Sequence, residues 1–213
     1  MKRVMLLILL MWSWMAMAQD TCFVSYPLPD SVFARMQGKS YARGCSINRT
    51  ELRYLRLSYR DEQGETRQGE LVCNRSIASD LMDIFRQLWK AGYRIGGMQL
   101  IDDFDADDQR SMKANNTSCF NFRYISGTRK VSKHGMGMAV DVNPLYNPYI
   151  YTRAGRTRVE PPEGEPYAHD RQTRTDIPHK IDHNDLCYRL FRQHGFRWGG
   201  DWRSCKDYQH FEK

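Results

Sequence analysis

Two short segments of the 213-residue chain carry histidines and carboxylates at spacings that could bind a metal ion. In the first, Ser132 to Asp141, a histidine (His134) precedes the final aspartate by seven residues. An odd separation would place two side chains on opposite faces of one regular strand. Gly135 and Gly137 permit a bend that turns the carboxylate back toward the imidazole. On this spacing alone, a capped turn with a surface histidine is an equally good interpretation.

The second segment lies near the C-terminus and reads Asp207-Tyr208-Gln209-His210-Phe211-Glu212. The acid Asp207 precedes His210 by three residues, a spacing that brings both to one face of a helical turn, and an irregular approach to a strand can do the same. Three histidine and carboxylate ligands with a fourth position left to water are typical of a catalytic zinc site. A further free carboxylate beside such a site can take a proton from the attacking water and pass it to the leaving amine.

Together the two segments resemble the M15 family of zinc peptidases, the group of D-alanyl-D-alanine carboxypeptidases and L-alanyl-D-glutamate endopeptidases. The family motif S-x-H-x-x-G-x-A-x-D is matched by Ser132, His134, Gly137, Ala139 and Asp141. The second motif, D-x-x-H-F-E, is matched by Asp207 and His210, and residues 199–202 (Gly-Gly-Asp-Trp) are similar to the family's approach to its last ligand. The likeness also includes residues 107–123 and covers about residues 52–213 in all.

The resemblance implies one zinc ion per chain, held by His134, Asp141 and His210. It further implies that Asp207 is the catalytic base and that Arg123 steadies the tetrahedral oxyanion, a role that suits an always-charged guanidinium. The implied fold is α+β: a small antiparallel sheet flanked by helices, as in the DD-peptidase and Hedgehog-like zinc domains, with the metal in a cleft.

The implied activity is hydrolysis of peptide bonds in peptidoglycan stem peptides. Because the family's endopeptidases carry aspartate in D-x-x-H while its dipeptidases and many carboxypeptidases carry glutamate, Asp207 favours an L-alanyl-D-glutamate endopeptidase. The alternatives are a D-alanyl-D-alanine carboxypeptidase and a non-catalytic, zinc-stabilised cell-wall-binding module. A binding module has no use for Asp207 and Arg123 beside a metal, which favours the enzyme.

The N-terminus has the pattern of a secretory signal. Lys2 and Arg3 precede the apolar run Val4 to Leu10, and the small-residue stretch Ala16-Met17-Ala18 follows. The apolar run falls short of the roughly 20 residues of a permanent membrane span, although an uncleaved anchor is an alternative. We therefore expect a signal peptide over residues 1–18 and an exported protein, periplasmic or secreted, without stable membrane insertion after cleavage.

The mature chain of about 195 residues fits a single domain, and we expect an N-terminal extension over residues 19–51 before a peptidase domain over residues 52–213. The net charge of +7 falls to about +5 once Lys2 and Arg3 are removed, a moderate excess that suits anionic surroundings such as a cell wall. Because no compact basic run stands out, no nucleic-acid partner is expected. The stem peptide is the expected partner, and the sequence does not indicate the oligomeric state.

An even number of cysteines in an exported chain favours disulfides. All of them follow the expected cleavage point: Cys22, Cys45, Cys73, Cys119, Cys187 and Cys205. None has C-x-x-C spacing, so a four-thiolate zinc site has little support. The connectivity stays open, and Cys187 and Cys205 are candidates for a staple around the second motif.

Hydrophobic periodicity predicts a β-hairpin from residues 52–59 and 70–73, and a helix over residues 76–91 that is capped by Asn74 or Ser76 and stopped by Gly92. The remaining expected elements are short strands at 98–101, 140–142 and 208–211 and a second helix at 181–194.

Two loops are predicted between these elements. Residues 102–108 read as a solvated acidic loop, because they lack the glycine and glutamate of a calcium loop. Residues 143–178 hold six of the chain's eight prolines and read as a long irregular excursion that could cover a substrate.

Overall fold

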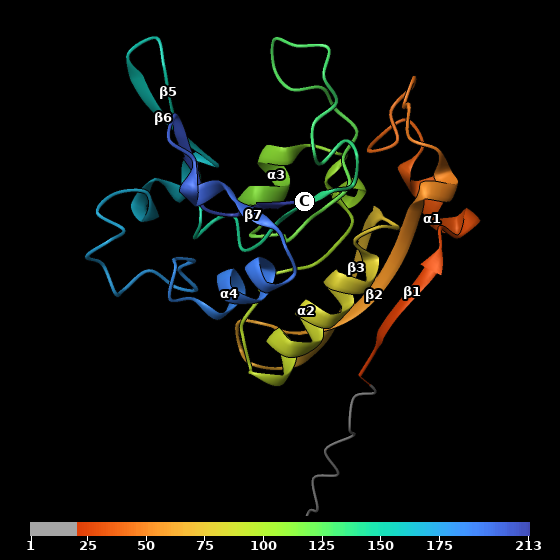
Figure 1. The fold of residues 1–213 in the computed structure, drawn as a ribbon, viewed down its shortest axis with the longest axis horizontal. Coiled ribbons are helices and arrows are strands. Elements are labelled where there is room, and N and C mark those ends of the chain that lie inside the picture. Colours follow the sequence, from red (N-terminus) through yellow and green to blue (C-terminus); the bar gives the residue numbers. More distant parts are fainter. Residues whose placement is uncertain (1–20) are drawn as a thin grey trace, which may run out of the picture.

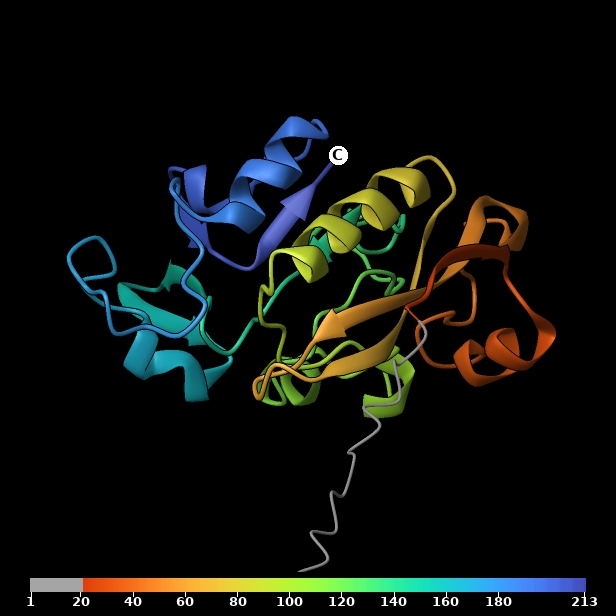
Figure 2. The same ribbon diagram turned by 90° about the horizontal axis from the view of Figure 1, so that it is seen from below.

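The computed structural model of the protein describes residues 21–213, so the signal peptide predicted over residues 1–18 lies outside the described residues. This part of the chain forms three antiparallel sheets of three strands each, together with four α-helices (Figures 1 and 2). The α+β class predicted from the sequence is confirmed, with the sheet divided into three. None of the helices in residues 21–213 has both the length and the apolar character needed to cross a bilayer.

The first sheet has the order β1-β2-β3 and contains the predicted hairpin. Strands β2 (Leu52–Arg60) and β3 (Thr66–Asn74) pair in register along their full length. Strand β1 (Phe23–Pro27) pairs antiparallel with β2, so the segment expected as an N-terminal extension supplies an edge strand of this sheet. Apolar side chains of the sheet, among them Leu55 and Leu71, are fully buried in the main core.

Helix α2 (Ala78–Lys90) packs on this sheet and confirms the helix predicted over residues 76–91. It ends at Lys90, and Gly92 follows two residues later with a φ of +72°, which glycine readily adopts. The predicted cap is wrong, because the residue at the cap position is Ile77 and makes no side-chain cap bond. The Asn74 carboxamide oxygen instead accepts a hydrogen bond from the Ser76 backbone N–H in the preceding turn (3.0 Å).

The second sheet, of order β4-β9-β7, is formed by β4 (Ala139–Asp141), β9 (His210–Glu212) and β7 (Arg197–Trp198). The strands predicted at 140–142 and 208–211 are confirmed with ends shifted by one or two residues. Helix α4 (Leu186–Gln193) is shorter than the helix predicted over residues 181–194, because Asp185 caps it. The ring of Phe191 in α4 stacks on Phe211 in β9 at 4.2 Å and joins this sheet to the core.

The third sheet, of order β6-β5-β8, corrects the prediction of an irregular excursion over residues 143–178. Strands β5 (Tyr149–Arg153) and β6 (Arg156–Glu160) form a hairpin, and β5 also pairs with β8 (Cys205–Asp207). The turn consists of Ala154 and Gly155, both at positive φ (49° and 71°), as tight hairpins require. The sequence signal for this hairpin is the pair of segments YIYTR and RTRVE on either side of Ala-Gly. The many prolines around the hairpin favoured a loop prediction instead.

The remaining elements are short. They are α1 (Asp30–Met36), α3 (Asp108–Lys113) and the 3-10 helices Arg49–Glu51, Ile101–Phe104, Pro162–Tyr167 and Gly199–Asp201. The strand predicted at residues 98–101 is wrong, since the chain there leads into a 3-10 helix. The acidic loop is not uniformly solvated either. Asp102 is buried and accepts hydrogen bonds from the backbone N–H (3.0 Å) and the hydroxyl (2.9 Å) of Ser40.

All six cysteines lie within residues 21–213 and all are free thiols, which corrects the expectation of disulfides. Cys73, Cys119 and Cys187 are buried in the core, where they pack as small apolar side chains. The proposed staple is not formed either. Cys187 lies on the inner face of α4, whereas Cys205 lies on β8. Disulfide formation depends on the positions of the cysteine side chains. These positions cannot be deduced from an even number of cysteines or from an expected oxidising compartment.

The cap of α4 makes the stability of the protein depend on pH. The Asp185 carboxylate accepts a hydrogen bond from the Cys187 backbone N–H (2.8 Å), and burial raises its pKa from 3.8 to about 6. Because the folded-state pKa is raised, stability falls as the pH rises from about 4 to above 6. Between pH 4.5 and 7.5 we expect the wild-type protein to lose about 2 kcal/mol of its free energy of unfolding through this group. Asp185→Asn keeps a capping oxygen but does not ionise, so this loss should be absent in the variant. Urea unfolding at both pH values measures this loss, with Asp107→Asn at the exposed cap of α3 as the matched control.

Candidate metal centre

Three of the predicted site residues, His134, Asp141 and His210, meet at one point. Their ligand atoms all lie within 4.8 Å of one another. Nε2 of His134 is 3.1 Å from Nδ1 of His210 and 3.2 Å from a carboxylate oxygen of Asp141. Both imidazoles are buried, and no other group of three such side chains meets within residues 21–213. This group could hold a metal ion.

Strand pairing brings two of these side chains together. Asp141 in β4 and His210 in β9 are directly opposite each other in the antiparallel register and therefore point to the same face of the sheet. His134 reaches the point from the turn that precedes β4. That turn contains the predicted bend at Gly137, which has a φ of +67°, and a Cβ there would lie 2.7 Å from the backbone nitrogen of Asn74. Only glycine fits this close approach of the metal motif to β3.

Hydrogen bonds on the outer side of each histidine select the nitrogen that is free for a metal. Nδ1 of His134 lies 2.7 Å from the Cys119 carbonyl, to which it donates, and this leaves the Nε2 lone pair for a ligand. Nε2 of His210 lies 3.3 Å from a carboxylate oxygen of Glu212, which leaves Nδ1 pointing to Asp141. Such outer partners are the usual supports of metal-binding histidines. When both imidazoles are deprotonated, each offers a lone pair at the same point as the Asp141 carboxylate, and this donor set fits a metal ion that takes the place of the proton.

The electrostatics of the group also fit a cation. Burial raises the pKa of Asp141, but the adjacent His134 and His210 outweigh this effect and hold the pKa well below its ordinary value. Burial lowers the pKa of His210, yet its contacts with Asp141 and Glu212 raise it to about 10. The carboxylate is thus ionised, and the surroundings favour positive charge at this point.

Asp207, the predicted base, stands at the end of β8 beside this group. Its Oδ1 atom is buried and has no hydrogen-bond partner among the described residues. Burial raises the pKa of Asp207 to about 7, and the repulsion from Asp141 adds to it, against the attraction of His210 and Arg123. A buried acceptor without a donor is costly, so this carboxylate is suited to accept a proton from a molecule bound in the site.

Arg123, the predicted oxyanion partner, is held close to the first motif. Its Nε donates to Asp108 (2.7 Å) and one of its terminal nitrogens donates to the Ser132 hydroxyl (3.3 Å). Asp108 is itself fixed by the side-chain amide of Asn121 (2.9 Å). Sequence reasoning missed Asp108 as a support for Arg123 and Glu212 as a support for His210. Glu212 could have been found from its position two residues after the histidine, on the same face of a strand.

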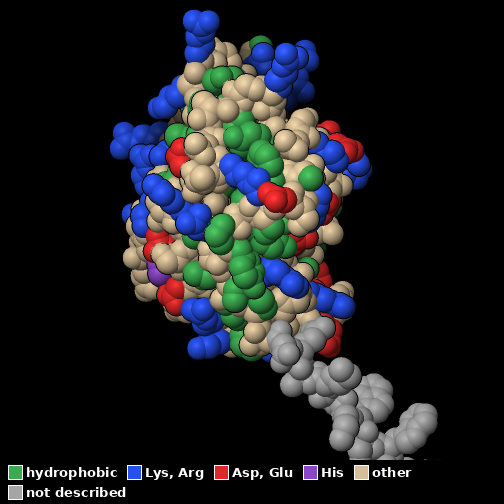
Figure 3. All heavy atoms as spheres, turned by 90° about the vertical axis from the view of Figure 1, so that its right-hand side faces the viewer, with side chains coloured by type: hydrophobic (Ala, Val, Ile, Leu, Met, Phe, Trp, Pro, Cys, Tyr) green, Lys and Arg blue, Asp and Glu red, His purple; other side chains and the backbone are tan. Residues whose placement is uncertain are grey.

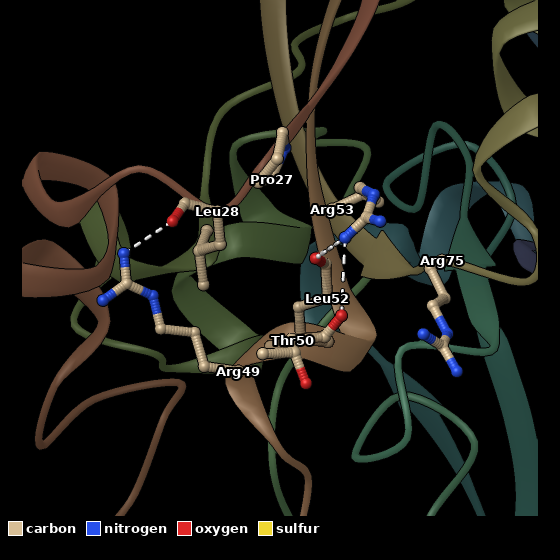
Figure 4. Close-up of a pocket in the computed structure, with 7 residues that line it drawn as sticks. All are labelled: Pro27, Leu28, Arg49, Thr50, Leu52, Arg53 and Arg75. Carbon is tan, nitrogen blue, oxygen red and sulfur yellow. Dashed lines mark hydrogen bonds between the residues drawn. The ribbon is translucent and has the colours of Figure 1, made fainter.

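A hollow at one end of the first sheet lies outside this site. The cavity in Figure 4 has a volume of about 550 Å³, and its lining residues are Pro27, Leu28, Arg49, Thr50, Leu52, Arg53 and Arg75. Figure 3 shows the side of the molecule that carries β1 and α1, with apolar side chains along its middle and lysines and arginines around them. None of the predicted site residues lines the cavity, and we assign no chemistry to it.

A second glycine brings the base and a ligand together. A Cβ on Gly199 would lie 2.6 Å from the Asp207 carbonyl oxygen and 3.2 Å from the His210 Cβ. Gly199→Ala should therefore displace both residues, at a cost of about 1–3 kcal/mol in stability and at least tenfold in metal affinity. Thermal unfolding and zinc titration measure the two effects. Gly97→Ala, where the nearest atom would be 3.7 Å away, is the matched control. Normal zinc affinity in Gly199→Ala would contradict this role.

A group of two histidines and an aspartate, with a free acid and an arginine beside it, has the composition of a hydrolytic metal centre. Residues 126–213 match a family model described as D-alanyl-D-alanine carboxypeptidase, and this segment contains His134, Asp141, Asp207 and His210. The match confirms the resemblance to the M15 family over this C-terminal segment and supports, at a coarse level, a hydrolase that acts on peptide bonds of peptidoglycan. No curated protein and no solved structure matches the chain.

Proposed function

We propose that the protein is an exported zinc peptidase that cleaves the stem peptide of peptidoglycan between L-alanine and D-glutamate. The observation that carries the proposal is the buried, unpartnered carboxylate oxygen of Asp207 beside the group of His134, Asp141 and His210. One zinc ion would be held by these three residues. The domain over residues 52–213, with a DD-peptidase or Hedgehog-like arrangement, and the removal of residues 1–18 on export belong to the same proposal.

The residues around the metal point have complementary roles in this proposal. A zinc ion bound there supplies Lewis acidity that lowers the pKa of a water molecule to near 7. Asp207 takes the proton from the attacking water and returns it to the leaving amine. Arg123, held by Asp108 and Ser132, places a fixed positive charge on the oxyanion that develops at the reacting carbonyl.

An extended surface next to Asp207 supports cleavage inside a peptide. Asp207 pairs with Tyr149 in β5, and the rings of Tyr149 and Tyr151 stack at 4.8 Å on the same face of the sheet. This face of the third sheet extends from Asp207 in the direction away from His134, Asp141 and His210. In our proposal it binds several residues of the substrate. The second candidate function is removal of a terminal D-alanine, which the description of the matching family model favours.

Digestion of purified peptidoglycan with zinc-loaded protein and mass analysis of the fragments tests the proposal. We expect new termini at L-alanine and D-glutamate. Release of free D-alanine from pentapeptides without other products would instead establish the carboxypeptidase. If the protein binds peptidoglycan and releases no fragment, the non-catalytic wall-binding module becomes the better interpretation.

A further inference from the structure

The hairpin β5–β6 carries three arginines without counter-charges. Their backbones pair in the hairpin, but the side chains of Arg153, Arg156 and Arg158 form no hydrogen bond or ion pair within residues 21–213. Some arginines of the described chain are paired with carboxylates, for example Arg174 with an aspartate at 2.6 Å and Arg197 with a glutamate at 2.7 Å. Guanidinium groups left free on a projecting hairpin are available to bind an anion from outside the protein.

Two of these arginines line a cavity. Arg153 and Arg158 border a hollow of about 630 Å³ between the hairpin, the start of α3 at Gln109 and the 3-10 helix Pro162–Tyr167. This volume is in the range of small-ligand sites. Figure 1 shows the hairpin projecting on one side of α3. Because Gln109 is one of its lining residues, the cavity borders the helix whose first residue, Asp108, holds Arg123.

The cavity also contains two glutamates, and both are already engaged. Glu160 accepts a hydrogen bond from the hydroxyl of Tyr151 (2.7 Å), and Glu165 pairs with His169 (2.7 Å). Neither glutamate forms an ion pair with Arg153 or Arg158 in the described part of the chain. Both glutamates keep their negative charge, but the two guanidinium groups are the cavity's positive charges and neither is held in an ion pair in the described chain.

The sheet links this cavity to the catalytic base. Asp207 is opposite Tyr149, and Tyr151, two residues farther along β5, is opposite Arg158. Residues in such register share one face. Arg158 and Asp207 lie on the two strands that flank β5, two strand spacings apart, and are offset by two residues along the strand direction. Their backbones are therefore about 12 Å apart. An extended chain covers this distance in three to four residues.

We infer that the cavity is a subsite for a carboxylate of the substrate, bound by Arg153 and Arg158 and located about three residues from the cleaved bond. The inference rests on the proposed function, because it assumes that Asp207 marks the point of cleavage. In a stem peptide cut before D-glutamate, the side-chain carboxylate of diaminopimelate reaches this distance. A stem peptide with lysine at the same position lacks that carboxylate, so the subsite selects the diaminopimelate type.

Two peptides that differ only at this position test the inference: L-Ala-γ-D-Glu-diaminopimelate-D-Ala and its lysine counterpart. We expect wild-type protein to prefer the diaminopimelate peptide by roughly 10- to 100-fold in kcat/KM, mostly through KM, the range for charge-assisted hydrogen bonds. In the Arg153→Ala/Arg158→Ala double variant, the kcat/KM values for the two peptides should differ by no more than about twofold. Arg156→Ala, on the same hairpin but outside the cavity lining, is the matched control and should keep the preference.

A binding measurement separates failure of this inference from failure of the proposed function. Calorimetric titration of both peptides into zinc-loaded Asp207→Asn protein reports the preference without turnover. If wild-type protein cleaves neither peptide, the proposed function is wrong, and the titration still decides whether the arginines select the carboxylate. Equal affinity for both peptides, or a preference that survives in the folded double variant, would overturn the subsite.

Discussion

Replacing His134 and His210 together with alanine should leave the protein without bound zinc and without peptidase activity. In the proposed site these imidazoles are two of the three ligands, and Asp141 alone would not hold the ion. We expect about one zinc per chain in the wild-type protein and essentially none in the double variant, measured by metal analysis after dialysis. A chelator should likewise abolish the activity of the wild-type protein, and zinc should restore it.

The matched control for this variant is a second pair of histidines. His179 and His183 are spaced like two ligands on a helix, but His179 pairs with Glu62 (3.0 Å) and His183 pairs with Asp201 (2.8 Å). Alanine at both positions should leave zinc content and activity near the wild-type values. Full zinc occupancy in the His134 and His210 double variant would refute the assignment of the metal centre.

Asp207→Asn should retain zinc and fold normally while turnover falls by roughly 100-fold or more, the scale of a lost general base. The amide has nearly the same size as the carboxylate but cannot accept and return a proton. The measurement is kcat on a stem peptide together with the zinc content of the same preparation. Asp201→Asn changes a neighbouring exposed aspartate and serves as the control. If Asp207→Asn hydrolyses the peptide at a near-normal rate, the base is another group and the wall-binding module gains support.

The metal group was predictable because its information is local and chemically specific. Residue type and spacing drew attention to the two segments, and the resemblance to the M15 family then singled out His134, Asp141 and His210 as ligands. The glycines in the first motif indicated the bend that the structure contains at Gly137. The hairpin of β2 and β3 and helix α2 were predictable for a similar reason, since each repeats its hydrophobic pattern over two or more turns or along a full strand.

The elements that the sequence did not predict depend on distant partners. Strand β5 is stabilised by β8, which lies more than 50 residues later in the chain, and prolines flank its hairpin on both sides. Asp102 is buried because Ser40, 62 residues earlier, supplies two donors. Composition alone predicted a loop in place of β5 and a solvated Asp102. In both cases the stabilising partner is too distant in the sequence to be identified from neighbouring residues.

The short pairing of β4 with β9 makes the metal centre part of the local stability of the protein. Each of these strands has three residues, fewer than an independent sheet needs, and Asp141 and His210 are direct partners across them. An ion bound by both residues therefore opposes separation of the two strands. When the free metal concentration is a thousand times the dissociation constant, the bound ion adds about 4 kcal/mol to the free energy of opening. Without the ion, the amides of β4 and β9 should exchange with solvent faster while those of β2 and β3 stay protected. If the proposed metal site is correct, the supply of metal should therefore set how exposed this sheet becomes to proteases, in addition to the fraction of protein that is active.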